Sequence, residues 1–329
     1  MNKENQIAFF KIIQEKLPKN ISLAQIVSEL LGFGVNAAYV RIRGAKALDF
    51  EETIKLCRHF GVSLNSFIGN TAQNNRILGD YMPLYGNEDD FYFLFLRSLV
   101  RKLEYYTAKP GFKITVLSLG DIPSFAMSLF PDAAVFRYFS WCNLFEGTKD
   151  AYEKFVDKKL TSEVINDFNS VEKSYRQIPS SEIWSTNTID TTLRFIGYHY
   201  EMGHFGDRNS ALLLCDKFME LISTLERWAT TGKKGDSGAA LKLYLSEIDV
   251  GNTFILYKTD EEQECWLKLF TSHGITFTDK IFCEEVENWL SHSLQRATLV
   301  SRASSMERYK FFDAQRQKIE ALAQRIKKN

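Results

Sequence analysis

The chain has 329 residues, 41 Lys and Arg against 41 Asp and Glu, 45% hydrophobic residues and 25% charged residues. This composition is typical of a soluble globular protein of about two domains, and it excludes a disordered or collagen-like chain. The neutral total excludes a protein that binds nucleic acid through bulk positive charge, although a small basic surface can exist within a balanced sum.

Four short helices are predicted in the first sixty residues, separated by turns that contain Gly or polar residues. Ser22 with Gln25, and again Asp49 with Glu52, form capping-box sequences, in which the two side chains satisfy backbone amides at a helix start. Gly44 ends the third helix, as is typical of a helix C-terminus. The predicted helices span residues 6–17, 22–31, 35–43 and 49–60.

The helix at residues 35–43 has two faces of different chemistry. At about 100° per residue, one face is apolar and is predicted to be buried. The other face is predicted to enter a DNA major groove, because Asn pairs with adenine, Arg with guanine or phosphate, and Ala and Val contact thymine methyl groups. The predicted buried residues are Val35, Ala38, Tyr39 and Ile42. The predicted groove-facing residues are Asn36, Ala37, Val40, Arg41 and Arg43.

Residues 22–67, SLAQIVSELLGFGVNAAYVRIRGAKALDFEETIKLCRHFGVSLNSF, resemble the lambda-repressor-like (Cro-type) helix-turn-helix family. Leu23 stands where that family usually has Gln, and Arg43 where it usually has an acidic residue. The resemblance implies that residues 22–31 cross the phosphate backbone and that residues 35–43 enter the major groove. The residues expected to contact DNA are Ser22, Gln25, Asn36, Ala37, Val40, Arg41, Arg43 and Lys46.

A change of pattern divides the chain into two domains. Residues 69–79 are rich in turn-forming residues and are predicted to be a linker between a helix-turn-helix domain at 1–68 and a second domain at 80–329. Residues 1–70 hold nine Lys and Arg against six Asp and Glu. Because this surplus is small, one domain alone should bind DNA weakly and with strong salt dependence, and a homodimer is expected.

The second domain is predicted to be α+β, mostly helical with a small antiparallel sheet, so that the whole chain is mainly α. Residues 113–119 form a predicted strand, and residues 241–248 and 253–257 a predicted antiparallel hairpin. Residues 304–328 form an amphipathic helix whose apolar stripe packs either on its own domain or on a second copy. The other predicted helices span residues 89–106, 122–130 (capped by Asp121) and 131–145, and further helices continue to residue 230.

Residues 85–145 contain 15 aromatic residues, which form either a packed core or the lining of an effector pocket. His199, Glu201 and His204 lack the spacing of a helical zinc site, and no metal or cofactor is expected. Residues 232–238 lack the phosphate-loop pattern and are predicted to be a mobile loop. Because no catalytic group of residues is recognisable either, an enzyme is not expected.

Residues 80–329 also resemble the C-terminal region of bacterial helix-turn-helix regulators to which no chemistry is assigned, through Asp121-Ile122-Pro123, Pro131, Trp141 and Phe311-Phe312. The sequence therefore predicts a homodimeric transcriptional regulator that binds a double-stranded DNA operator, and whose second domain either only dimerises or also senses a small-molecule or peptide effector. Five scattered cysteines and the lack of an 18-residue apolar run predict a cytoplasmic protein without a membrane partner. A peptide-pheromone-type receptor regulator and a helical protein-interaction module that does not bind DNA are the alternatives.

Overall fold

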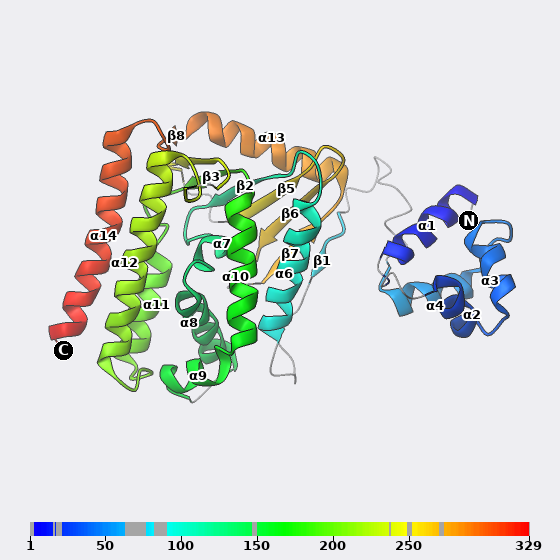
Figure 1. Cartoon of the computed structure of the whole chain (residues 1–329), viewed down its shortest axis with the longest axis horizontal. Coiled ribbons are helices and arrows are strands. Elements are labelled where there is room, and N and C mark those ends of the chain that lie inside the picture. The colour runs from blue at the N-terminus through cyan, green and yellow to red at the C-terminus, as the bar shows by residue number, and fades with distance from the viewer. Residues whose placement is uncertain are drawn as a thin grey trace. The chain divides into compact units, whose positions relative to one another are not determined.

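A computed structural model of the chain describes residues 3–15, 17, 22–62, 77–81, 91–146, 150–236, 238–248, 252–269 and 273–328. Its contacts divide into two compact units, Met1–Leu78 and Gly79–Asn329. The described chain is mainly helical, with one sheet in the second unit (Figure 1). Most of the predicted linker, residues 69–76, lies outside the described residues.

The first unit contains four helices among its described residues. They surround a small apolar core that includes Phe9, Phe10, Val27 and Leu56. The helices are α1 (Lys3–Glu15), α2 (Leu23–Leu31), α3 (Val35–Ile42) and α4 (Phe50–Phe60). All four form within the predicted ranges or within three residues of them. One helix-start prediction is wrong, because Ser22 is the N-cap of α2 but its side chain makes no cap hydrogen bond.

The second unit is built around a sheet of mixed strand directions, with the order β1-β7-β6-β5-β2-β3-β4-β8. Strands β2, β3 and β4 run parallel to one another, and the other pairings are antiparallel. The strands are β1 (Asp80–Tyr81), β2 (Lys113–Ser118), β3 (Ser180–Trp184), β4 (Leu241–Leu245), β5 (Phe254–Lys258), β6 (Gln263–Lys268), β7 (Gly274–Phe277) and β8 (Thr298–Leu299).

Two predictions about this sheet are wrong. The sheet is neither small nor purely antiparallel, and β4 and β5 do not form a hairpin, because β2 and β3 lie between them. Instead β4 pairs with β3 after a long crossover through helices, which is the connection that parallel strands require. The predicted run of helices to residue 230 is also interrupted by β3, whereas the predicted strand at 113–119 is confirmed by β2.

Helices cover both faces of the sheet. The larger apolar cluster joins one face to α6, α8, α10 and α12, whereas residues of α13 such as Cys283 and Leu290 cover the other face (Figure 1). The helices are α6 (Phe91–Thr107), α7 (Ser124–Met127), α8 (Pro131–Trp141), the π-helix η1 (Cys142–Glu146), α9 (Tyr152–Lys159), α10 (Ser162–Gln177), α11 (Asp190–Glu201), α12 (Arg208–Thr231), α13 (Lys280–Arg296) and α14 (Ser305–Lys328). Asp121 does not cap a helix from 122, because α7 begins later and Pro123 is its N-cap.

The apolar stripe of α14 packs on its own unit. Phe312, Ile319 and Ile326 are at most 1% exposed and belong to the core formed with α11 and α12. Of the two alternatives for this stripe, packing on its own domain is confirmed for these residues, because the unit's own core covers them. Tyr309, at 57% exposed, and Met306, at 63%, are the large apolar residues of the predicted helix that lie open.

Among the described helices, none is both long and apolar enough to cross a membrane. Helices α2 and α3 taken together are long and apolar enough, but the chain bends by 111° between them.

The segment predicted to be a mobile loop contains a buried lysine. Lys234 is fully buried, and its Nζ donates hydrogen bonds to the carbonyl oxygens of Tyr175 (3.1 Å) and Ile178 (2.8 Å). Burial lowers the pKa of Lys234 to about 7, although the carboxyl of Glu182, 3.9 Å away, opposes the shift. Lys234 therefore holds this segment against α10, which corrects the prediction of a mobile loop.

Lys234 predicts a pH dependence of stability. Between about pH 7 and its ordinary pKa of 10.5, the unfolded chain carries this proton and the folded chain does not. Lys234 should therefore contribute a rise of about 1.4 kcal/mol per pH unit to the free energy of unfolding in this window. Denaturant titrations from pH 7.5 to 9.5 should show a slope more positive by this amount in wild type and in Lys233→Met, the exposed neighbour, than in Lys234→Met. Parallel curves for wild type and Lys234→Met would contradict the assignment.

Candidate nucleic-acid interface

Helix α3 presents a different face to solvent from the predicted one. Val35 is 41% exposed and Tyr39 47% exposed, and Asn36 and Arg43 are exposed as well. Ala38 is buried, and so is Arg41, at 7% exposed. The exposed face is thus rotated by about a quarter turn from the predicted one, because side chains follow one another at about 100°.

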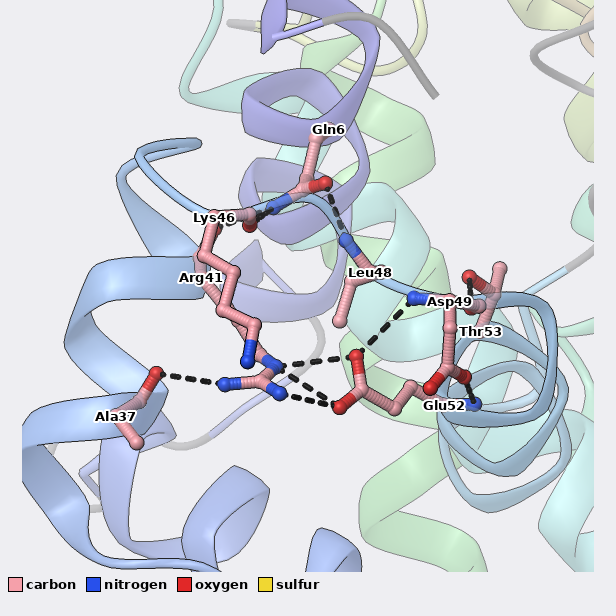
Figure 2. Close-up of polar contacts among 8 residues, drawn as sticks. All are labelled: Gln6, Ala37, Arg41, Lys46, Leu48, Asp49, Glu52 and Thr53. Atoms are coloured by element: carbon pink, nitrogen blue, oxygen red, sulfur yellow. Dashed lines mark hydrogen bonds and ion pairs between the residues drawn. The ribbon is translucent and has the colours of Figure 1, made fainter.

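Arg41 is part of the interior of the first unit. Its Nε lies 3.0 Å from both carboxylate oxygens of Glu52, and its Nη1 donates to the carbonyl of Ala37 at 3.4 Å (Figure 2). The guanidinium also stacks on the ring of Phe33, 4.1 Å from its centroid. Arg41 therefore joins α3 to the turn before it and to the start of α4, and the prediction that it lies on the exposed, groove-facing side of α3 is wrong.

Glu52 contacts a helix start as well as Arg41. It accepts a hydrogen bond from the amide of Asp49 at 3.1 Å, and Asp49 accepts one from the amide of Glu52 at 2.7 Å, which confirms the predicted capping box (Figure 2). The hydrogen bond from Arg41 lowers the pKa of Glu52 below its usual value. Glu52 is therefore an ionised partner for Arg41 at neutral pH.

The segment after α3 is positioned by a buried residue that the sequence analysis did not single out. Gln6 is 1% exposed; its Nε2 donates to the carbonyls of Arg41 (2.7 Å) and Lys46 (2.8 Å), and its Oε1 accepts from the amide of Leu48 (2.9 Å) (Figure 2). Gly44 has φ +70°, and a Cβ there would lie 2.8 Å from Lys3 Cγ. These contacts fix the backbone of Lys46, whose side chain is exposed.

The turn between α2 and α3 is closed by local hydrogen bonds. Gly32 ends α2 in the left-handed conformation with φ 72°, and the Ser28 hydroxyl donates to the carbonyl of Phe33 at 2.6 Å. Gln25, one turn into α2, is exposed, whereas Ser22 is half-buried. The turn therefore sets the angle between the two helices that the family resemblance assigns to DNA.

The predicted contact residues thus fall into three groups. Gln25, Asn36, Arg43 and Lys46 are exposed; Ser22, Ala37 and Val40 are half-buried; and Arg41 is buried. The structure adds two exposed side chains that the predicted helix face had excluded, Val35 and Tyr39. The exposed α3 face, defined here as Val35, Asn36, Tyr39 and Arg43, combines an amide, a phenol, a guanidinium and a small apolar group.

In the second unit, His199 and His204 lie together in an aromatic environment. Their Nδ1 atoms are 2.9 Å apart, so one ring must donate and the other accept, and burial lowers the pKa of His199 to about 4. Phe136 and Phe139 pack against His199. Within the described ranges, no group of three His, Cys, Asp or Glu residues could hold a metal ion.

Comparisons of the chain with family models, with curated proteins and with solved structures found no match in any of the three.

The Arg41–Glu52 pair predicts a large effect on the stability of the first unit. The two side chains are 8% and 15% exposed, so Arg41→Met leaves a largely buried carboxylate without its partner. We expect the free energy of unfolding of this unit to fall by about 3 kcal/mol, measured on the full chain by hydrogen exchange of α3 and α4. Adding Glu52→Gln should recover part of the loss.

Arg43→Met provides the matched control, because Arg43 lies on the same helix but is exposed. It should change stability by less than about 0.5 kcal/mol. Equal losses for Arg41→Met and Arg43→Met would show that the ion pair does not stabilise the unit.

Proposed function

We propose that the chain is a sequence-specific DNA-binding transcriptional regulator of the cytoplasm, with α3 in the major groove of its operator. The observation that carries the proposal is the exposed α3 face. Asn36 can pair with an adenine edge, Arg43 with guanine or phosphate, and Val35 with a thymine methyl group. These side chains project from a short helix whose base is held by Arg41 and Gln6, so the face is rigid.

Helix α2 supports the same proposal. Because the Ser22 side chain makes no cap bond, the first amides of α2 are not satisfied by it and can bind a phosphate group at the positive end of the helix. Gln25 and Lys46 are exposed and can add further phosphate contacts. We therefore assign base reading to α3 and positioning on the phosphate backbone to Gln25, Lys46 and the start of α2.

A peptide-pheromone-type receptor is less favoured. Its sensing part would be built of helical repeats, whereas the second unit here has a mixed sheet at its centre. A regulator with an effector-binding second unit, rather than an enzyme, is our proposal for the whole chain.

The proposal predicts separate roles for charge and base reading. Asn36→Ala and Arg43→Ala should each weaken operator binding by about 1–3 kcal/mol and relax the preference at one base position. Lys11→Ala, an exposed charge on α1, should leave the base preference unchanged. Binding of a randomised DNA pool by the full-length variants, with circular dichroism as a check on folding, measures both effects.

Unchanged base preference in both α3 variants would contradict base reading by this face. If wild type binds no DNA even at low salt, the exposed Val35 and Tyr39 favour the alternative of a protein-interaction module.

We also propose that the chain acts as a homodimer, because one short helix reads only a few base pairs and two copies multiply specificity. Sedimentation of the full chain at micromolar concentration should give a dimer, and the selected DNA should contain inverted half-sites about one helical turn apart. A monomer that selects a single half-site would contradict this proposal.

A further inference from the structure

A cleft opens between helix α6 and the antiparallel half of the sheet. Its volume is about 510 Å³, within the range of ligand pockets in proteins. The lining strands contribute alternate residues, because successive side chains on a strand point to opposite faces. They include Ile255 and Tyr257 from β5, Glu264 and Trp266 from β6, and Gly274 and Thr276 from β7.

The wide part of the cleft has mainly aromatic and apolar walls. Phe95 of α6, Phe125 of α7 and Trp266 of β6 line it. The indole of Trp266 lies against Gly274, where a Cβ would come within 2.2 Å of its Cε2. Among the acidic lining residues, Glu264 already pairs with Lys102 and accepts a hydrogen bond from the Tyr106 hydroxyl at 3.3 Å. The wide part therefore suits a flat apolar or aromatic group.

A narrow branch continues from the wide part. The two share Phe95, Leu99, Ser124, Ile255 and Trp266 as lining residues. The branch has a volume of about 80 Å³, well above the roughly 10–15 Å³ that one water molecule needs by the same measure. It is therefore large enough for one compact polar group.

The narrow branch carries an excess of positive charge. Its charged lining residues are Asp121, Arg137 and Lys268. Asp121 Oδ2 accepts from Arg137 Nη2 at 2.5 Å and lies 3.4 Å from Lys268 Nζ. Its Oδ1 accepts from the amide of Ile122 at 3.0 Å and from the Thr192 hydroxyl at 3.2 Å. The carboxylate of Asp121, whose two oxygens both accept hydrogen bonds, thus lies between the cations of Arg137 and Lys268.

Arg137, which lines this branch, has one donor without a partner. Its Nη1 is buried and makes no hydrogen bond within the part of the chain that the structure describes. A buried donor without an acceptor costs about 1–3 kcal/mol, which an anionic ligand would offset. Asp121 holds Arg137 in place through Nη2, so the guanidinium is already oriented.

We propose that this cleft binds a small organic anion with an aromatic or other flat apolar body. The compact anionic group, such as a carboxylate or sulfonate, enters the narrow branch and accepts hydrogen bonds from Arg137 Nη1 and Lys268 Nζ. The apolar body lies in the wide part against Phe95 and Trp266. This site supplies the effector chemistry of the second unit, and its test does not depend on DNA binding.

Two fluorescent probes of the same ring system test the proposal on the full chain. Anilinonaphthalene sulfonate carries the anionic group, and N-phenylnaphthylamine lacks it. We expect the sulfonate to bind one-to-one and more tightly than the neutral probe. Lys268→Met should weaken binding of the sulfonate by about threefold to tenfold, and Arg137→Met should weaken it by more than about tenfold. Neither variant should change the affinity for the neutral probe.

Two further variants control for charge and for folding. Lys242→Met removes one positive charge from an exposed position whose neighbours on β4, Leu241 and Leu243, face the opposite side, and it should leave both affinities unchanged. Ser98→Trp, on the α6 wall, should fill the wide part and abolish binding of both probes. Because Lys268 is less buried than Arg137, its variant tests the site even if Arg137→Met fails to fold.

Equal affinities for the two probes in wild type, or sulfonate binding that neither Lys268→Met nor Ser98→Trp reduces, would overturn the proposal. Either result would be independent of whether the chain binds DNA, because no DNA is present in the measurement.

Discussion

The geometry of the first unit depends on the ion pair between Arg41 and Glu52. Arg41 comes from α3, stacks on Phe33 in the turn before that helix, and pairs with a carboxylate that also closes the capping box of α4. A unit of this size has a small apolar core, so a largely buried ion pair is a substantial part of what fixes its helices. The pair sets which side chains of α3 face outward, and the proposed base reading by Asn36 and Arg43 follows from that orientation.

The second unit depends on a different constraint, the pairing of parallel strands at the centre of its sheet. Parallel neighbours such as β2 and β3 need long crossovers, and these supply helices that include α8 and α10 over one face. The antiparallel strands β5, β6 and β7 are joined by short connections and bring no helix of their own to that face. Their side chains instead line the cleft under α6. The aromatic-rich segment at residues 85–145 therefore contributes to both places, to the core through Phe136 and to the cleft through Phe95.

Local signals in the sequence predicted local structure well. The capping box at Asp49 and Glu52, the apolar strand at 113–119 and the apolar stripe of α14 all formed where predicted. Strand pairing could not be predicted in the same way, since β4 and β5 are adjacent in sequence but do not pair with each other: β4 pairs with β3, and β5 with β2 and β6. The exposed face of α3 was predicted wrongly because an Arg side chain on a short helix is usually exposed to solvent. The burial of Arg41 depends on its pairing with Glu52, eleven residues later. The clustering of Asp121, Arg137 and Lys268 likewise depends on the fold.

Hydrogen-bond satisfaction distinguishes the buried Arg41 from the half-buried Arg137. Arg41 directs Nε and Nη2 to Glu52 and Nη1 to the carbonyl of Ala37, so each nitrogen has an acceptor inside the unit. Arg137 pairs with Asp121 through Nη2 only, and its buried Nη1 makes no hydrogen bond to the described residues, while the residue itself lines a cleft that also contains Lys268. A fully satisfied guanidinium stabilises the fold, whereas one with a buried donor left over gains free energy from an added acceptor. The same residue type therefore has a structural role in α3 and a binding role in α8.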